Sequence, residues 1–213
     1  TAFETTFKAT NAKLSVMGQT LTGDFGFQKI TSGTFAGSTL ITAANVTLSL
    51  GNGATTFLNL TDGAGTFLLS TGGLVADISG TVALNVPNVS AGGTFKVRIN
   101  NITAAVNDAT LGLLNLPAGP YLQVSGTGVY LDILGQRLSG DFVMEQIKTG
   151  ANQDVLRISI ANGALSFGDG NTPLVSVNNA TGSFVVTAAG LAGTLSATVT
   201  TAQSLGATFN GTF

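Results

Sequence analysis

Apolar and polar residues alternate along most of this chain. Between Leu74 and Val86 every second residue is apolar or glycine, and the residues between them are mostly polar. A period of two predicts a β-strand with one apolar face, because successive side chains point to opposite sides of a sheet. The same pattern predicts further strands around 14–16, 21–27, 46–50, 67–69, 95–99, 138–144 and 191–199. No segment has a sustained helical period, and a helical turn or two is expected only within Thr103–Leu116.

The phase of the alternation changes at two places. Phe7 and Ala9 occupy odd positions, whereas the apolar residues after Asn11 occupy even ones, and the same change occurs around Asn45. An extra residue in one strand produces such a change, so the sequence predicts a β-bulge near each asparagine.

Glycine, asparagine and aspartate cluster between the predicted strands, as at Gly51–Gly53, Asp62–Gly63 and Gly72–Gly73. These residues tolerate the backbone conformations of tight turns. The short connections predict an all-β fold built as an antiparallel meander. Since each strand has one apolar face, a second layer is expected, either as a two-layer sandwich or within a continuous β rod.

The chain contains an internal repeat. Gly18–Phe25 returns as Gly135–Phe142, a shift of 117, and the same register holds for roughly 80 residues. We therefore predict two tandem modules, residues 1–117 and 118–213. Pro117 and Pro120 lie at their joint, where they cannot donate to a strand ladder and predict a short, stiff connector.

The second module is expected to be incomplete. The repeat loses register near Val199, and Thr208–Phe209 matches Thr94–Phe95 at a shift of 114. Counterparts of Asn100–Leu116 are then missing from the second module. Either the chain is a piece of something longer, or another chain supplies the missing strand. The start at Thr1, without Met or a signal pattern, also suggests a processed product or a piece.

Composition narrows the function classes. Charged residues make up only 8%, against about 25% in typical proteins, while apolar residues make up 44%. A polar surface with few charges favours contact with neighbouring copies, since net charge keeps proteins apart. Eight Lys and Arg, none adjacent, do not form a nucleic-acid footprint. No apolar run is long enough for a transmembrane helix.

The chain has no Cys and no His, which excludes disulfides, thiolate chemistry, a Ser-His-Asp triad and His-ligated metals. We therefore expect no enzyme, and we assign no catalytic, cofactor-binding or metal residues. Asp24 and Asp141 recur at equivalent positions before a phenylalanine, so alternation points them outward into a structural role.

Three weaker signals concern ligands. Thr61–Gly63 and Gly168–Gly170 have the look of acidic calcium turns, but turn formation explains them better because clustered carboxylates are lacking. For sugar binding, the sequence offers only Tyr121 and Tyr130 as aromatic platforms and has no Trp, so the signal for a sugar site is weak. N-glycosylation signals occur at Asn45, Asn59, Asn88, Asn101, Asn179 and Asn210.

Several phrases resemble a known family: Leu134–Phe142, Asn45–Gly53, Gly80–Pro87 and Leu116–Leu122. They are similar to the tandem β repeats of very large bacterial surface exoproteins, and the likeness covers nearly the whole chain. The resemblance implies an extracellular structural or adhesive role and carries no catalytic residues. Two modules, instead of dozens, are the departure from that family.

These observations predict a secreted or cell-surface structural repeat protein that assembles with copies of itself into a filament or surface layer. No cofactor is expected for it. The alternative is an adhesin segment that binds a glycan or surface partner, either with or without calcium.

Overall fold

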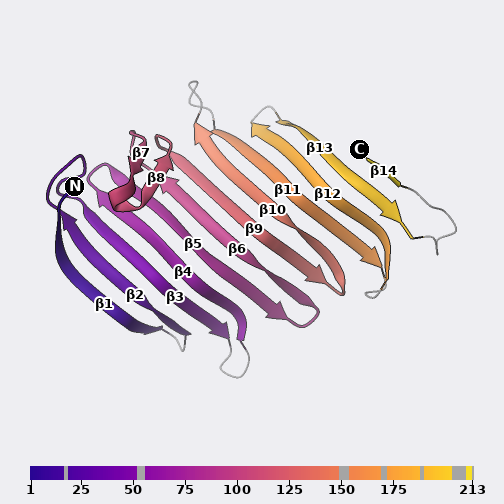
Figure 1. Cartoon of the computed structure of the whole chain (residues 1–213), viewed down its shortest axis with the longest axis horizontal. Coiled ribbons are helices and arrows are strands. Elements are labelled where there is room, and N and C mark those ends of the chain that lie inside the picture. The colour runs from indigo at the N-terminus through magenta and orange to yellow at the C-terminus, as the bar shows by residue number, and fades with distance from the viewer. Residues whose placement is uncertain are drawn as a thin grey trace.

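The computed structural model describes residues 1–16, 19–51, 56–148, 154–168, 172–187, 190–202 and 210–212. Figure 1 labels its elements in chain order. They are β1 (Phe3–Val16), β2 (Gln19–Ile30), β3 (Thr39–Gly51), β4 (Thr56–Ser70), β5 (Gly73–Val86), β6 (Val89–Asn100), β7 (Val106–Asp108), η1 (Ala109–Leu111), β8 (Leu113–Leu116), β9 (Tyr121–Ile133), β10 (Gln136–Lys148), β11 (Asp154–Gly168), β12 (Pro173–Thr187), β13 (Gly190–Thr201) and β14 (Asn210–Thr212).

Twelve of the strands form one antiparallel sheet in the order β1-β2-β3-β4-β5-β6-β9-β10-β11-β12-β13-β14. The predicted all-β class and antiparallel meander are confirmed. The sheet runs unbroken along the molecule's long axis (Figure 1). Across the described ranges, the expected second layer is confined to residues 101–120, and the rest of the sheet is a single layer. Within the described residues, the only other sheet is the small β7-β8 pair.

The repeat of the sequence is also a repeat of strands. β4 and β12, for example, span 56–70 and 173–187, a displacement of 117. β6 and β9 pair along their full lengths, from Val89–Ile133 to Asn100–Tyr121, so the sheet crosses the joint without interruption. The first strand of the second repeat is therefore hydrogen-bonded to the last long strand of the first.

The pairing of β14 corrects the expected match at the C-terminal end. Thr212 pairs with Thr198, whose counterpart Thr81 pairs with Thr94. Thr212 thus takes the place of Thr94, a shift of 118, instead of the expected shift of 114. Thr208 and Phe209 lie outside the described residues.

The predicted bulges at Asn11 and Asn45 are confirmed. Both residues have positive φ, 51° and 52°, and the strand registers shift at Ala9/Ala12 and Ala43/Val46. Asparagine tolerates this left-handed conformation better than most residues. Further bulges are centred on Asp62, Gly128, Asn162 and Asn179, whose φ values are 53°, 59°, 53° and 53°.

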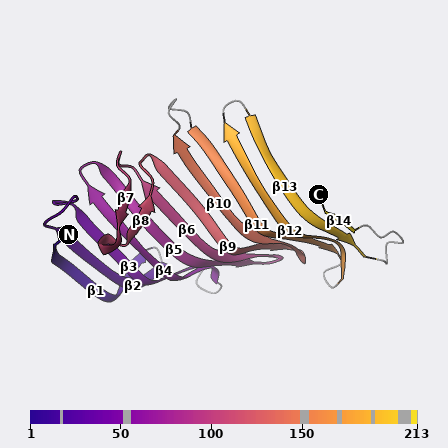
Figure 2. The ribbon, with the colours of Figure 1, turned by 45° about the horizontal axis from the view of Figure 1, so that its top comes forward.

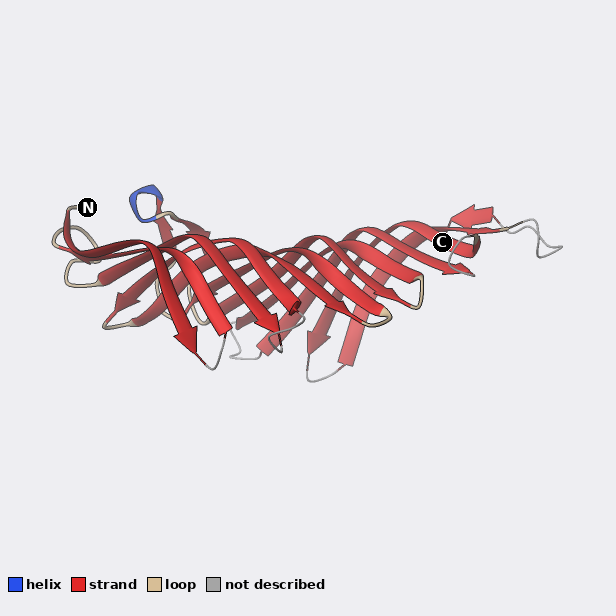
Figure 3. Cartoon of the chain, turned by 90° about the horizontal axis from the view of Figure 1, so that it is seen from below, coloured by secondary structure: helices blue, strands red, loops and turns tan. Residues whose placement is uncertain are grey.

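The bulges bend the sheet. Ala43 and Val46 pair with Gly65 and Gly63 on one face of β4, so the two residues between them share the opposite face and lengthen it. Figures 2 and 3 show the strands bending, with both strand ends curving to the same side. The sheet is thus a trough rather than a flat layer.

Glycines relieve crowding on the inner side of this bend. A Cβ added to Gly126 would lie 2.5 Å from the Phe142 ring. Phe95 and Phe142 flank this glycine on the neighbouring strands, and their ring centroids lie 6.1 Å apart. Paired glycines and aromatic rings of this kind stabilise strongly curved sheets.

Residues 101–120 form a cover segment that leaves the sheet after β6, lies on its outer side and returns to β9 (Figures 1 and 3). The Asp108 carboxylate accepts hydrogen bonds from the backbone N–H groups of Thr110 and Leu111 and begins η1. The expected helical turn is therefore present. The cover segment contributes no strand to the main sheet, because β6 pairs with β9.

The main buried apolar cluster lies under the cover segment. Side chains of the sheet pack there against Val106, Leu111, Leu113 and Leu116 of the cover segment. The contributing sheet residues are Ile30, Leu40, Leu68 and Val75. This cluster fastens the cover segment to the sheet, since fully buried aliphatic side chains each contribute about 1.5–3 kcal/mol.

Leu113 and Leu114 are neighbours with opposite environments, buried completely and 48% exposed. We expect Leu113→Ala to destabilise the cover segment by about 2–5 kcal/mol, since it leaves a cavity. Leu114→Ala should change stability by less than about 1 kcal/mol. Urea unfolding followed by tyrosine fluorescence measures the stability of both variants, because Tyr121 is the first residue of β9, where the cover segment rejoins the sheet. Equal effects of the two substitutions would contradict the assigned core.

Candidate assembly surfaces

The concave face of the sheet is apolar from one side of the molecule to the other. Register partners can be followed across eleven strands without meeting a charged or polar side chain. The row is Ala9, Phe25, Ala43, Gly65, Ile78, Val97, Val124, Met144, Ile158, Phe184 and Gly193. We call the surface that contains this row the apolar face.

The neighbouring row, one residue along each strand, has the opposite character. It contains Lys8, Gly26, Thr42, Thr66, Asp77, Arg98, Gln123, Glu145, Arg157, Val185 and Ala192. The Arg157 guanidinium lies 3.8 Å from the Glu145 carboxylate along this row. We call this convex surface, which also bears the cover segment, the polar face.

Little of the apolar face is fully buried. Among the described residues, the buried hydrophobic side chains lie mainly in or beneath the cover segment, and Ala76 is the one that belongs to the apolar face. A hollow of about 340 Å³ lies at the bend, lined by residues such as Phe25, Val46, Phe67 and Phe95. Most of the apolar face of the described structure is therefore open.

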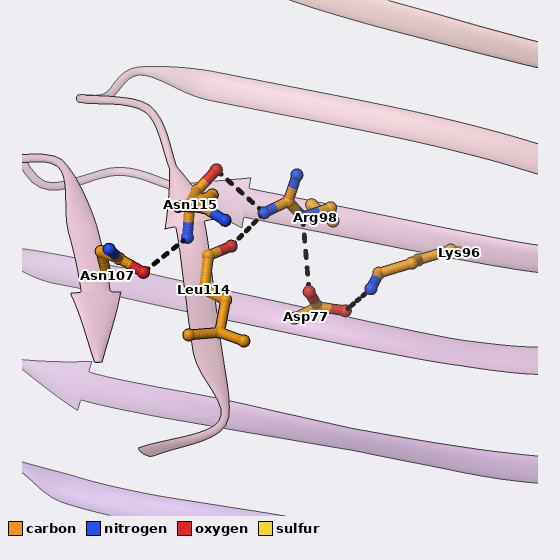
Figure 4. Close-up of polar contacts among 6 residues, drawn as sticks. All are labelled: Asp77, Lys96, Arg98, Asn107, Leu114 and Asn115. Carbon is orange, nitrogen blue, oxygen red and sulfur yellow. Dashed lines mark hydrogen bonds and ion pairs between the residues drawn. The ribbon is translucent and has the colours of Figure 1, made fainter. Parts of the chain in front are cut away.

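Charged residues attach the cover segment to the polar face (Figure 4). Asp77 lies 3.0 Å from Lys96 Nζ and 3.3 Å from Arg98 Nε. Arg98 Nη2 donates to the backbone carbonyls of Leu114 and Asn115 in β8. The arginine thus joins a carboxylate of the sheet to the backbone of the cover segment.

Asn100 holds both ends of the cover segment. Its side chain is completely buried, and its amide nitrogen donates to the carbonyls of Ala104 and Pro117, at 2.9 and 2.7 Å. Its amide oxygen accepts from the backbone N–H of Ile102 at 3.0 Å. Every hydrogen atom of the amide nitrogen is used, as a buried amide requires.

The two tyrosines have separate environments. Tyr121 is 3% exposed. The pKa of Tyr121 is raised to about 12, mainly by burial of the side chain and secondly by a hydrogen bond to the Glu145 carboxylate. The Arg137 guanidinium lies 4.4 Å from the centre of the Tyr130 ring, within cation–π distance.

Asp24 and Asp141 lie on the polar face and fasten the bulges. The Asp24 carboxylate accepts from the backbone N–H of Asn11 and from the side chain of Asn45, both at 2.7 Å. One carboxylate on β2 thereby ties the bulges of β1 and β3 together. Asp141 repeats the arrangement with the N–H of Gly128 at 2.7 Å and the side chain of Asn162 at 2.6 Å.

These bonds favour the ionised carboxylates. The pKa of Asp24 is lowered by the hydrogen bond from the Asn11 backbone, then by that from Asn45. The pKa of Asp141 is lowered by the backbone of Gly128, then by Asn162. The structural role predicted from the recurrence of Asp24 and Asp141 is therefore to hold the bulges of the neighbouring strands.

The other predicted ligand positions have local roles. Asp62 is the positive-φ residue of a bulge, and Asp169 lies outside the described residues. Among described residues, no three Asp, Glu, His or Cys side chains group as a metal site. Asn45 and Asn179 occupy bulges, Asn88 a turn with φ 65°, and Asn59 accepts from Ser49, while the Asn101 side chain is exposed. The side chain of Asn210 lies outside what the structure describes.

The two edges of the sheet are the second candidate surface. β1 lies at one end of the strand order and β14 at the other. β1 is a strand of 14 residues with one hydrogen-bonded neighbour. An uncovered edge of this length is a template for pairing with another strand.

No protein-family model, no curated protein and no solved structure matches this chain. In the part of the chain that the structure describes, no helix has the length and apolar character needed to cross a membrane.

The carboxylate links predict an acid-sensitive fold. A carboxyl group whose pKa is lower in the folded chain than its ordinary 3.8 stabilises the fold above that value. This stability is lost as the pH falls below 3.8. Asp24→Asn with Asp141→Asn should lower the denaturation midpoint at neutral pH and flatten its decline between about pH 5 and 3.

Asp132→Asn is the matched control, since Asp132 lies on the same face away from the bulges. Urea midpoints measured across this pH range compare the variants. An unchanged pH profile in the double variant would show that the two carboxylates do not stabilise the bend.

Proposed function

We propose that this chain is a structural repeat protein that joins copies of itself edge to edge, outside the cell or at its surface. The observation that carries the proposal is the pairing of β6 with β9. There the last long strand of one repeat receives the first strand of the next in full antiparallel register. A joint between repeats within one chain is a template for a joint between chains.

Because the sequence repeats, the two strands at the ends of the sheet correspond to the two strands of this internal joint. β9 is the counterpart of β1, and the three residues of β14 occupy the place of Gly92–Thr94 in β6. In the internal joint Thr94 pairs with Thr127. Their counterparts are Thr212 at one edge and Thr10 at the other, so the same residue types would meet if β1 of one copy paired with β14 of another.

Such a contact is heterologous, because each copy presents a different edge to its neighbour. Contacts of this type continue into open filaments unless the geometry closes a ring. The composition supports the proposal: charge is 8% of the chain, so self-repulsion between copies is small. The extracellular setting rests on this charge-poor composition and on the resemblance to surface exoproteins.

Cysteine cross-linking tests the joint, and the absence of native Cys makes each introduced thiol unique. We expect Thr10→Cys with Thr212→Cys, treated with a short bismaleimide, to give a ladder of covalent oligomers on a denaturing gel. Thr94→Cys with Thr127→Cys should form the same link inside one chain and give no ladder.

The control for random collision is Thr10→Cys with Thr47→Cys, which places the second thiol on β3, inside the sheet. A ladder as strong as that of the first pair would refute edge pairing, as would the absence of any ladder from the Thr10/Thr212 variant at high concentration.

A further inference from the structure

The chain exposes far more surface than a compact protein of its size. Its accessible surface is 12405 Å², whereas a compact monomer of the same mass exposes about 9,100 Å². The excess of about 3,300 Å² follows from the single-layer sheet. Edge pairing does not cover it, because adding strands in the same layer leaves the apolar face open.

Exposure of the apolar face is greatest toward the ends of the strands. At the bend, rings such as Phe95 and Phe142 lean together over a glycine and are half-buried. The large exposed side chains of this face lie mostly nearer the rims of the trough: Phe7, Leu69, Leu122, Leu131, Ile133, Leu138, Phe167 and Leu191. Met144 in the central row and Leu195, the partner of Gly182, are also exposed. The surface that needs a partner is therefore two largely apolar rims on either side of a partly filled centre, and one rim also carries the register partners Glu4 and Lys29.

We infer that the apolar face binds the apolar face of a second copy, giving a two-layer assembly in which each chain supplies the other's missing layer. Obligate homodimers bury about 2,000–5,000 Å² in total, or about 1,000–2,500 Å² from each partner. The excess of about 3,300 Å² per chain, to which the open apolar face contributes, is larger than this requirement. A two-fold arrangement places rim against rim, and the central row carries no charge to be buried unpaired.

This contact is distinct from the edge joint of the proposed function. Face pairing uses side chains of the concave surface, whereas edge pairing uses the outer backbone of β1 and β14. Either can fail while the other holds, and together they would give a ribbon two sheets thick.

Two adjacent residues of β10 allow a matched test. Met144 lies on the apolar face and is 38% exposed, and Val143 lies on the polar face and is 37% exposed. We expect Met144→Asp to weaken association at least tenfold and halve the mass measured by sedimentation velocity. Val143→Asp should leave the mass unchanged, although it adds the same charge to the same strand.

Leu138→Asp provides a second apolar-face variant, at a position that is 52% exposed, in case Met144→Asp does not fold. Far-UV circular dichroism confirms folding, and the Thr10/Thr212 cross-linking ladder in the Met144→Asp background reports edge pairing separately. A persisting ladder with halved mass supports face pairing as an independent contact.

Three results would overturn the inference. The first is a wild-type chain that stays monomeric at high micromolar concentration. The second is an equal loss of mass from Met144→Asp and Val143→Asp. The third is a monomer that floats with phosphatidylcholine vesicles and loses this binding through Met144→Asp, because the occupant would then be lipid.

Discussion

The bend along the middle of the sheet is the constraint on which the rest of this structure depends. Strands of 12 to 15 residues would otherwise form a nearly flat ribbon, with equal areas on its two faces. One extra residue in six strands lengthens the polar face, and glycines on the other side make room for the curvature. Asp24 and Asp141 hold four of these bulges from the strand between them. The bend makes the apolar face concave and the polar face convex.

This geometry separates two kinds of stability. The cover segment builds a small conventional core on the convex face, closed by aliphatic side chains and by the amide of Asn100. The concave face relies on backbone pairing and on rings that cover one another within a single layer. In a sheet of this kind the strands form their hydrogen bonds within the layer, but part of the apolar surface of the layer stays exposed. The remaining burial has to come from outside the layer.

The local structure of this chain could be read from its sequence, and its long-range contacts could not. Alternation and phase changes depend on neighbouring residues, so they predicted the strands and placed the bulges at Asn11 and Asn45. The recurrence of Asp24 and Asp141 indicated a structural role, but their partners lie on other strands and needed the register. The contacts of Arg98 and Asn100 with the cover segment left no pattern in the sequence at all, because each depends on where residues 101–120 fold back. The same limit explains the shift of 114: Thr-Phe occurs at both 208–209 and 212–213, and the pairing of Thr212 decides between them.

The direction of the strands has a mechanical consequence. The strands run obliquely across the long axis of the molecule, and β1 and β14 lie at its opposite ends (Figure 1). A pull between those ends therefore has a component along the ladder hydrogen bonds, which favours opening them one strand pair at a time over shearing a whole strand at once. Each six-strand repeat is about 29 Å wide in the direction perpendicular to its strands while folded. The 117 residues of the first repeat reach about 400 Å when fully extended. A chain of such repeats would therefore yield under tension by gradual lengthening, as an extensible tether does, while the cover segment, lying across the face, is not directly in the line of force.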